Sequence, residues 1–216
     1  MAPNAPLFDS GQGEQHPAGW AKQLSAPGQM TAKGKDQARL YFALWPDEPT
    51  LRGLGVAQAD LAGRKTQKDQ LHLTLAFLGN QPIGKLPALA AVLEQLPEKS
   101  FVIELDQYGY FKQQRIAWIG SAEVPLALLD LREYLLKGLS IVAPHYKRES
   151  RFIPHVTLAR DAERPVQPFA SSICWPAKRV VLVQSLPTSQ GVIYSLIAER
   201  LLDDAVAPVA PVAPAS

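Results

Sequence analysis

Two short segments with the same alternation of polar and apolar residues constrain the fold of this chain more than any other feature. Because the side chains of a β-strand alternate between its faces, this period of two predicts a strand in each segment. In the first segment the apolar face carries Leu71, Leu73, Leu75 and Phe77, and the opposite face carries His72, Thr74 and Ala76. In the second, the apolar face carries Val156 and Leu158, and the opposite face carries His155, Thr157 and Ala159. Each strand is therefore predicted to present a histidine and a threonine away from the core.

This repeated pair of residue types suits phosphodiester hydrolysis. Imidazole has the unperturbed pKa closest to neutrality, so two imidazoles can serve as general acid and general base. Threonine hydroxyls two residues along can hydrogen-bond phosphate oxygens that gain charge in the reaction. We therefore predict His72 and His155 as catalytic residues and Thr74 and Thr157 as phosphate ligands, with no metal and no cofactor. A lone histidine fits a structural role, but packing does not require the same polar pair twice.

Basic and aromatic residues near the two segments are candidates for substrate binding. A basic stretch precedes each segment: Arg64, Lys65 and Lys68 before the first, and Lys147, Arg148 and Arg151 before the second. Rings on which a nucleobase can stack are those of Tyr41, Phe42, Tyr110 and Phe111. Since Tyr41 and Phe42 are adjacent in a predicted strand, at least one of them is expected in the core. Solvated loop surface is the alternative explanation for the basic stretches.

Composition limits the class of protein. The chain has 216 residues and a formal net charge of +2, so bulk charge does not indicate a polyanion-binding protein. Its single cysteine, Cys174, and the absence of a long apolar run favour a cytoplasmic protein. Residues 1–37 are rich in Pro, Gly and Gln and are expected to be disordered, as is the Ala/Pro/Val-rich tail 203–216. Residues 38–202 would form the folded domain.

Within this domain the pattern predicts an α+β fold. Strands are expected at 39–45, 101–106, 115–119, 178–185 and 192–200, besides the two His-x-Thr strands, with a hairpin-like connection at 108–112. Helices are expected after Asp47 or Thr50, at 86–93 and at 125–142, the last with an apolar stripe of Leu126, Leu129, Leu136 and Leu139. Each half of the chain supplies a strand, a helix, a basic stretch and a His-x-Thr strand. This order suggests two antiparallel-sheet lobes with outer helices, related by approximate symmetry around a central cleft.

The two motifs resemble the paired His-x-Thr-x signatures of the 2H phosphoesterase superfamily. The stretches 39–46, 71–79, 115–120, 152–160, 181–185 and 191–194 resemble, in order, its bacterial RNA 2′,3′-cyclic phosphodiesterase branch, also called 2′-5′ RNA ligase. The resemblance implies a bilobal fold that hydrolyses RNA 2′,3′-cyclic phosphate ends to 2′-phosphates. It implies His72 as proton donor and His155 as proton acceptor, although a symmetric site permits the reverse, and it adds Arg160 to the residues expected to bind substrate.

Two other functions stay open at this point. The same groups would catalyse the reverse reaction, joining RNA ends through a 2′-5′ linkage, and a nucleotide- or RNA-binding module would keep the groove without turnover. Expected partners are RNA ends or nucleoside cyclic phosphates, including tRNA fragments. We expect the protein to act as a monomer and to have no membrane partner.

Overall fold

The structure, a computed structural model, describes residues 36–149, 151–188 and 191–203. Apart from residues 36, 37 and 203, the predicted N-terminal extension (1–37) and C-terminal tail (203–216) lie outside these ranges. No helix in the described part of the chain is long and apolar enough to cross a membrane.

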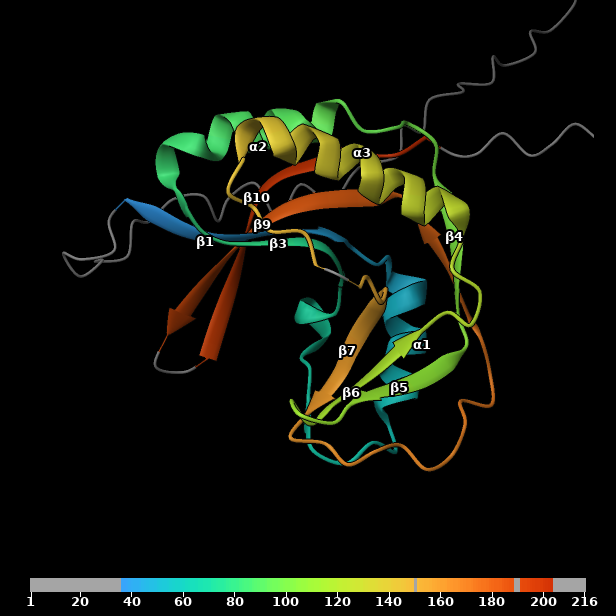
Figure 1. Ribbon diagram of the computed structural model, residues 1–216. Helices are drawn as coiled ribbons and strands as arrows, with labels where there is room; N and C mark the ends of the chain where they lie inside the picture. Colours follow the sequence, from blue (N-terminus) through green and yellow to red (C-terminus); the bar gives the residue numbers. More distant parts are fainter. Residues whose placement is uncertain (1–35, 150, 189–190, 204–216) are drawn as a thin grey trace, which may run out of the picture. The chain divides into compact units, whose positions relative to one another are not determined.

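One antiparallel sheet of eight strands forms the centre of the described domain (Figure 1). Seven of its strands follow the order β10-β9-β1-β3-β7-β6-β5, and β2 pairs with β7. These strands are β1 (Gln37–Leu44), β2 (Arg64–Lys65), β3 (Leu73–Pro82), β5 (Gln107–Phe111), β6 (Ile116–Gly120), β7 (His155–Arg160), β9 (Arg179–Thr188) and β10 (Gly191–Leu201). A separate two-stranded sheet pairs β4 (Phe101–Leu105) with β8 (Ile173–Ala177).

The sheet consists of two halves that share a core but, in the described part of the chain, only a single backbone pairing. Strands β10, β9, β1 and β3 form one half, and β7, β6, β5 and β2 form the other. Within the described residues, the halves are joined by one residue pair, Leu73 of β3 with Val156 of β7. Strands joined at one point can diverge on either side of it, which leaves room for a cleft between the halves. The predicted α+β class with two antiparallel halves is thus confirmed.

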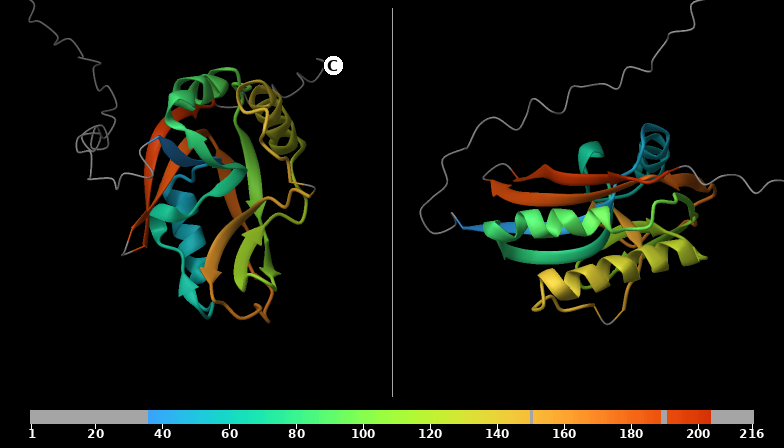
Figure 2. Two further views of the ribbon diagram at one scale, coloured as in Figure 1. Left: turned by 60° about the vertical axis from the view of Figure 1, so that its left-hand side comes forward. Right: turned by 90° about the horizontal axis from the view of Figure 1, so that it is seen from above.

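Helices cover the outer faces of both halves. Helices α2 (Leu86–Glu94) and α3 (Leu126–Val142) pack together over the first half, where they contact β3, β9 and β10 (Figures 1 and 2). Helix α1 (Glu48–Gln58) packs against β7 and β8. Asp47 caps α1, since its carboxylate accepts a hydrogen bond from the Thr50 amide at 2.9 Å. The helices thereby seal one side of the sheet and leave the other side open to ligand.

The buried face of α3 differs from the predicted stripe. Leu126 is 77% exposed and Leu129 is 38% exposed, whereas Leu128, Leu131 and Leu135 are buried. Leucines occur all around this helix, so periodicity alone favoured the wrong side. Of the predicted stripe, Leu136 and Leu139 are buried.

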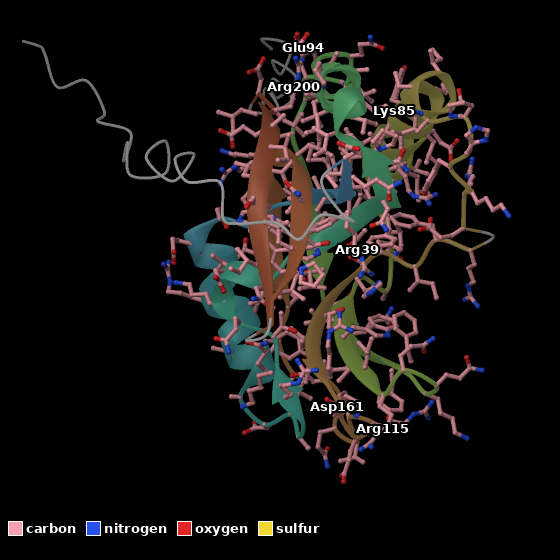
Figure 3. The ribbon with its side chains drawn as sticks, turned by 90° about the vertical axis from the view of Figure 1, so that its left-hand side faces the viewer. Arg39, Lys85, Glu94, Arg115, Asp161 and Arg200 are labelled. Atoms are coloured by element: carbon pink, nitrogen blue, oxygen red, sulfur yellow. The ribbon has the colours of Figure 1, made fainter. Side chains whose placement is uncertain are left out.

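Two predicted strand features are also wrong. Residues 108–112 are not a connection, because 107–111 form strand β5, paired with β6, and the turn follows at Lys112–Arg115. Strand β4 pairs with β8, an element that the sequence pattern missed, and not with β6. Arg115, at this turn, has a positive φ of 52°, as does Asp161 at the end of β7, and the two residues lie together at one end of the domain (Figure 3).

Strand β3 changes face halfway along. Two register shifts against β1 leave Leu75 and Leu78 without partners in that strand. The predicted alternation therefore holds up to Leu75 and then inverts: Ala76 is buried in the core, and Phe77 is 42% exposed. The prediction had these two residues on the opposite faces. A bulge of this kind re-aims side chains beside a site.

Gly109 of β5 offers a test of the second half of the sheet. A Cβ atom at this position would lie 1.9 Å from Cζ2 of Trp118 on β6. Gly109→Ala is therefore expected to destabilise the protein by about 3 kcal/mol in urea unfolding, because the Trp118 ring packs against Phe111 and His155 and has little room to move aside. Gly55→Ala in α1 is the control, since nothing lies within 4 Å of its added Cβ. Equal unfolding midpoints for the two variants would contradict this packing.

Candidate active site

A cleft of about 900 Å³ lies between the two halves of the sheet. Its walls come from β1 and β3 on one side, β7 on the other, and the β9–β10 hairpin. His72, Thr74, His155 and Thr157 all line it. The structure therefore brings the two His-x-Thr pairs, one from each half, into one cavity.

The two imidazoles are held in the same way. Nδ1 of His72 lies 2.7 Å from the carbonyl oxygen of Gln70, and Nδ1 of His155 lies 2.7 Å from that of Ile153. A carbonyl oxygen only accepts hydrogen bonds, so Nδ1 is the donor in both rings. This leaves Nε2 of each ring as the nitrogen that takes up or releases a proton. In both motifs the carbonyl lies two residues before the histidine.

Aromatic rings pack around both imidazoles. The His72 ring stacks on Tyr41 at 4.8 Å and on Trp45 at 5.7 Å between centroids, and Tyr194 meets it edge-on at 5.8 Å. The His155 ring contacts Phe111 edge-on at 5.0 Å and lies 5.7 Å from Trp118. Each imidazole is thereby held between rings, which fixes its plane as the carbonyl fixes its tautomer.

Cations line the cleft on both sides. On the β2 and β7 side these are Arg64, Lys65 and Arg160. Arg64 forms an exposed ion pair with Asp161 at 3.3 Å, whereas the guanidinium of Arg160 has no hydrogen-bond or ion-pair partner among the described residues. On the other side, the Arg39 guanidinium lies 5.0 Å from the centroid of the Phe77 ring (Figure 3 labels Arg39). The cleft can thus receive an anionic group together with a flat ring.

Comparisons with known proteins agree with this geometry. A family model described as the 2′-5′ RNA ligase superfamily matches residues 45–185. The RNA 2′,3′-cyclic phosphodiesterase of Thermus thermophilus is 31% identical over 176 residues, which cover 74% of this chain and 87% of that protein. The chain therefore belongs to the 2′-5′ RNA ligase superfamily. The RNA 2′,3′-cyclic phosphodiesterase of Escherichia coli is 34% identical over 105 residues, which cover 49% of this chain and 59% of that protein.

Solved structures from the same superfamily share the fold. Escherichia coli LigT in its apo form superimposes with a TM-score of 0.70 at 26% identity, covering 77% of this chain and 98% of LigT. The complex of E. coli LigT with 3′-AMP gives a TM-score of 0.68 over the same shares of the two chains. Membership of the superfamily, expected from the His-x-Thr motifs, is thus confirmed.

Burial determines the protonation state of the two histidines in the cleft. The pKa of His72 falls from 6.5 to about 4 in total: burial is the largest cause, the Gln70 carbonyl opposes it, and the positive charges of His155 and Arg160 act with it. Burial also lowers the pKa of His155, and Arg160 acts in the same direction. In the free cleft both rings are therefore neutral near pH 7.

No group of three His, Cys, Asp or Glu side chains suited to a metal occurs among the described residues.

Of the residues expected to bind substrate, five line the cleft: Tyr41, Phe111, Arg160, Arg64 and Lys65. The others lie elsewhere: Lys68 pairs with Glu48, and Lys147 is exposed outside the cleft lining. Phe42 is fully buried under the helices, because it alternates with Tyr41 along β1. The Tyr110 hydroxyl donates to the Ala162 carbonyl at 3.0 Å, outside the cleft. Arg148 pairs with Glu133 of α3, and Arg151 is exposed away from the cleft lining.

Several residues at the site were missed from sequence. Trp45, Tyr194 and Trp118 contact the imidazoles, and Arg39 and Phe77 line the cleft. A signal existed for Trp45, because it follows Tyr41 by four residues and the strand period puts both on one face. Trp118 lies opposite Thr157 in the β6–β7 ladder, a pairing that no local pattern contains.

The depressed pKa of His72 predicts a pH-dependent stability. Since the unfolded chain binds a proton below pH 6.5 that the folded protein refuses until about pH 4, acidification through this window destabilises the fold. From pH 7 to pH 5 the contribution of His72 is about 2 kcal/mol. His72→Asn keeps a donor for the Gln70 carbonyl but does not titrate, so its urea midpoint should fall less between these pH values.

The control is His145→Asn, at an exposed position outside the cleft lining. This variant should keep the wild-type difference between pH 7 and pH 5. An identical loss of stability in His72→Asn and in the wild type would show that His72 is not held neutral by burial.

Proposed function

We propose that this protein hydrolyses the 2′,3′-cyclic phosphate ends of RNA to 2′-phosphates, with His72 and His155 as the acid–base pair. The observation that carries the proposal is the matched anchoring of the two imidazoles. Each uses Nδ1 to bind its own backbone, each keeps Nε2 for proton transfer, and both line one cleft with a threonine two residues along. The names of the E. coli and T. thermophilus relatives support the same activity.

The chemistry needs one proton to leave and another to arrive. One imidazole accepts a proton from a water molecule as the water oxygen attacks phosphorus. The other imidazole donates a proton to the departing 3′-oxygen as the P–O3′ bond breaks. Thr74 and Thr157 donate hydrogen bonds to the non-bridging phosphate oxygens. In family terms His72 is the donor and His155 the acceptor. A bound phosphodiester anion raises the pKa of a nearby imidazole, which opposes the effect of burial and lets the donor hold its proton.

The cleft suits an RNA end. Its volume of about 900 Å³ exceeds what a single phosphate requires. Arg160 can contact the phosphate of a bound chain, and Phe111 and the Phe77–Arg39 pair offer surfaces against which a base can stack. Fragments of tRNA fall within this substrate class. Because one chain supplies both histidines and both threonines, we expect the monomer to be active. We also expect it to act in the cytoplasm, since the free, exposed thiol of Cys174 fits a reducing compartment.

The test is hydrolysis of an oligonucleotide ending in 2′,3′-cyclic phosphate, in the presence of EDTA. The wild type should yield the 2′-phosphate, and His72→Ala and His155→Ala should each lower kcat by about 10²–10⁴. Thr74→Val and Thr157→Val should lower it less, because each removes one hydrogen bond to phosphate. His145→Ala is the matched histidine control and should keep wild-type activity. Undiminished hydrolysis in both His72→Ala and His155→Ala would reject the mechanism.

The family description gives a second candidate reaction. If a 5′-hydroxyl of a second RNA took the place of water, its oxygen would attack the same phosphorus as the P–O3′ bond breaks and the 3′-oxygen takes a proton, forming a 2′-5′ linkage, because the same base and acid serve either nucleophile. Water greatly outnumbers RNA ends, which favours hydrolysis. Supplying a 5′-hydroxyl RNA and following the length of the product decides whether ligation occurs.

A further inference from the structure

A buried arginine on α3 lies outside the cleft and is not explained by the proposed chemistry. Arg132 is only 2% exposed, although it is charged. Burial of a guanidinium is costly unless its N–H groups are paired, and apolar replacements of buried ion pairs are often equally stable. Stability alone therefore does not account for an arginine at this position.

The contacts of Arg132 link the two halves of the active site. Its Nε donates to the Leu75 carbonyl at 2.9 Å, and its Nη2 pairs with Oε2 of Glu149 at 2.5 Å. Its guanidinium carbon lies 4.1 Å from the centroid of the Phe152 ring. Leu75 directly follows Thr74 on β3, whereas Glu149 and Phe152 belong to the segment that enters β7 before His155. One side chain thus ties both His-x-Thr strands to one helix.

The geometry of the sheet makes this tie consequential. Strands β3 and β7 share a single residue pair, Leu73 with Val156, within the described residues. Beyond that pair β3 bulges, so Leu75 has no partner in the β1 register, and its carbonyl accepts from Arg132 instead. Helix α3 runs along this half of the sheet, and the chain leaves its end to return to β7 (Figure 1). Arg132 thereby supplies a second connection between the strands.

We propose that Arg132 is a positioning residue, which fixes the spacing between the His72–Thr74 pair and the His155–Thr157 pair. The inference depends on the proposed hydrolysis. Arg132 does not line the cleft, so it acts through the strands and not on the substrate. A displacement of about 1 Å between catalytic groups can cost roughly 10²-fold in rate, whereas binding of the substrate depends on it less.

The experiment compares kcat, KM and thermal unfolding for variants of this tie, with the cyclic phosphate oligonucleotide as substrate. Arg132→Met should lower kcat by roughly 10- to 100-fold and change KM less than about threefold, at a temperature where the variant is folded. Arg132→Lys keeps the charge but not the forked geometry, so its kcat should lie between those of the wild type and Arg132→Met.

Two glutamate variants, Glu149→Gln and Glu133→Gln, distinguish a positioning role of Arg132 from a general effect on stability. Glu149→Gln weakens the tie of Arg132 to the segment before β7, and it should lower kcat roughly two- to fivefold. Glu133→Gln breaks the other ion pair between α3 and the same segment, Arg148 with Glu133, which does not reach β3. This control should keep wild-type kcat.

A double variant provides a readout that a purely structural role would not affect. We infer that Arg132 acts through the imidazoles. The fold-decrease in kcat of the double variant Arg132→Met/His155→Ala should therefore be much smaller than the product of the fold-decreases in the two single variants. A folded Arg132→Met with wild-type kcat, or multiplicative losses in the double variant, would overturn the inference. If Arg132→Met does not fold, wild-type kcat in both Arg132→Lys and Glu149→Gln would overturn it. An inactive wild type would instead reject the proposed function.

Discussion

The active cleft depends on one backbone contact, the pairing of Leu73 with Val156 between the two halves of the sheet. Each residue follows a catalytic candidate, since Leu73 comes after His72 and Val156 after His155. The side chains of a paired residue and its neighbour point to opposite faces. The apolar partners therefore enter the shared core, and the histidines turn to the other face, where the cleft lies. Divergence of the strands beyond this pair opens space for substrate between them.

Burial of the imidazoles has two opposing effects. Packing against Tyr41 and Trp45 on one side, and against Phe111 and Trp118 on the other, holds the rings still. The same packing removes water and lowers the pKa of both histidines, so the free cleft holds two neutral rings. In the hydrolysis that we propose, an anionic phosphate would reverse this effect by stabilising a protonated ring. The charge that the proposed reaction needs would then be assembled when substrate binds.

The bulge in β3 connects the cleft to the core behind it. Skipping Leu75 turns Phe77 toward the cleft, beside Arg39, and sends Ala76 into the core. The same irregularity frees the Leu75 carbonyl, which a buried guanidinium on α3 then satisfies. The bulge in β3 therefore affects the structure on both faces of the sheet. It shapes the substrate wall on one face and anchors a helix on the other.

The sequence by itself determined which polar residues face the cleft and the class of the fold. His72, Thr74, His155 and Thr157 were predictable as cleft-facing residues because the alternation of a strand is a local property. The start of α1 and the extents of α2 and α3 followed, within a few residues, from equally local capping and periodicity. Only the tertiary structure decided which face of α3 is buried, that β4 pairs with β8, and that Phe42 and Arg148 lie away from the cleft. It also decided the bulge that turns Phe77 around and the place of Arg132 between the strands. These features arise from contacts between residues far apart in the chain, where several arrangements satisfy the same local pattern and packing selects one.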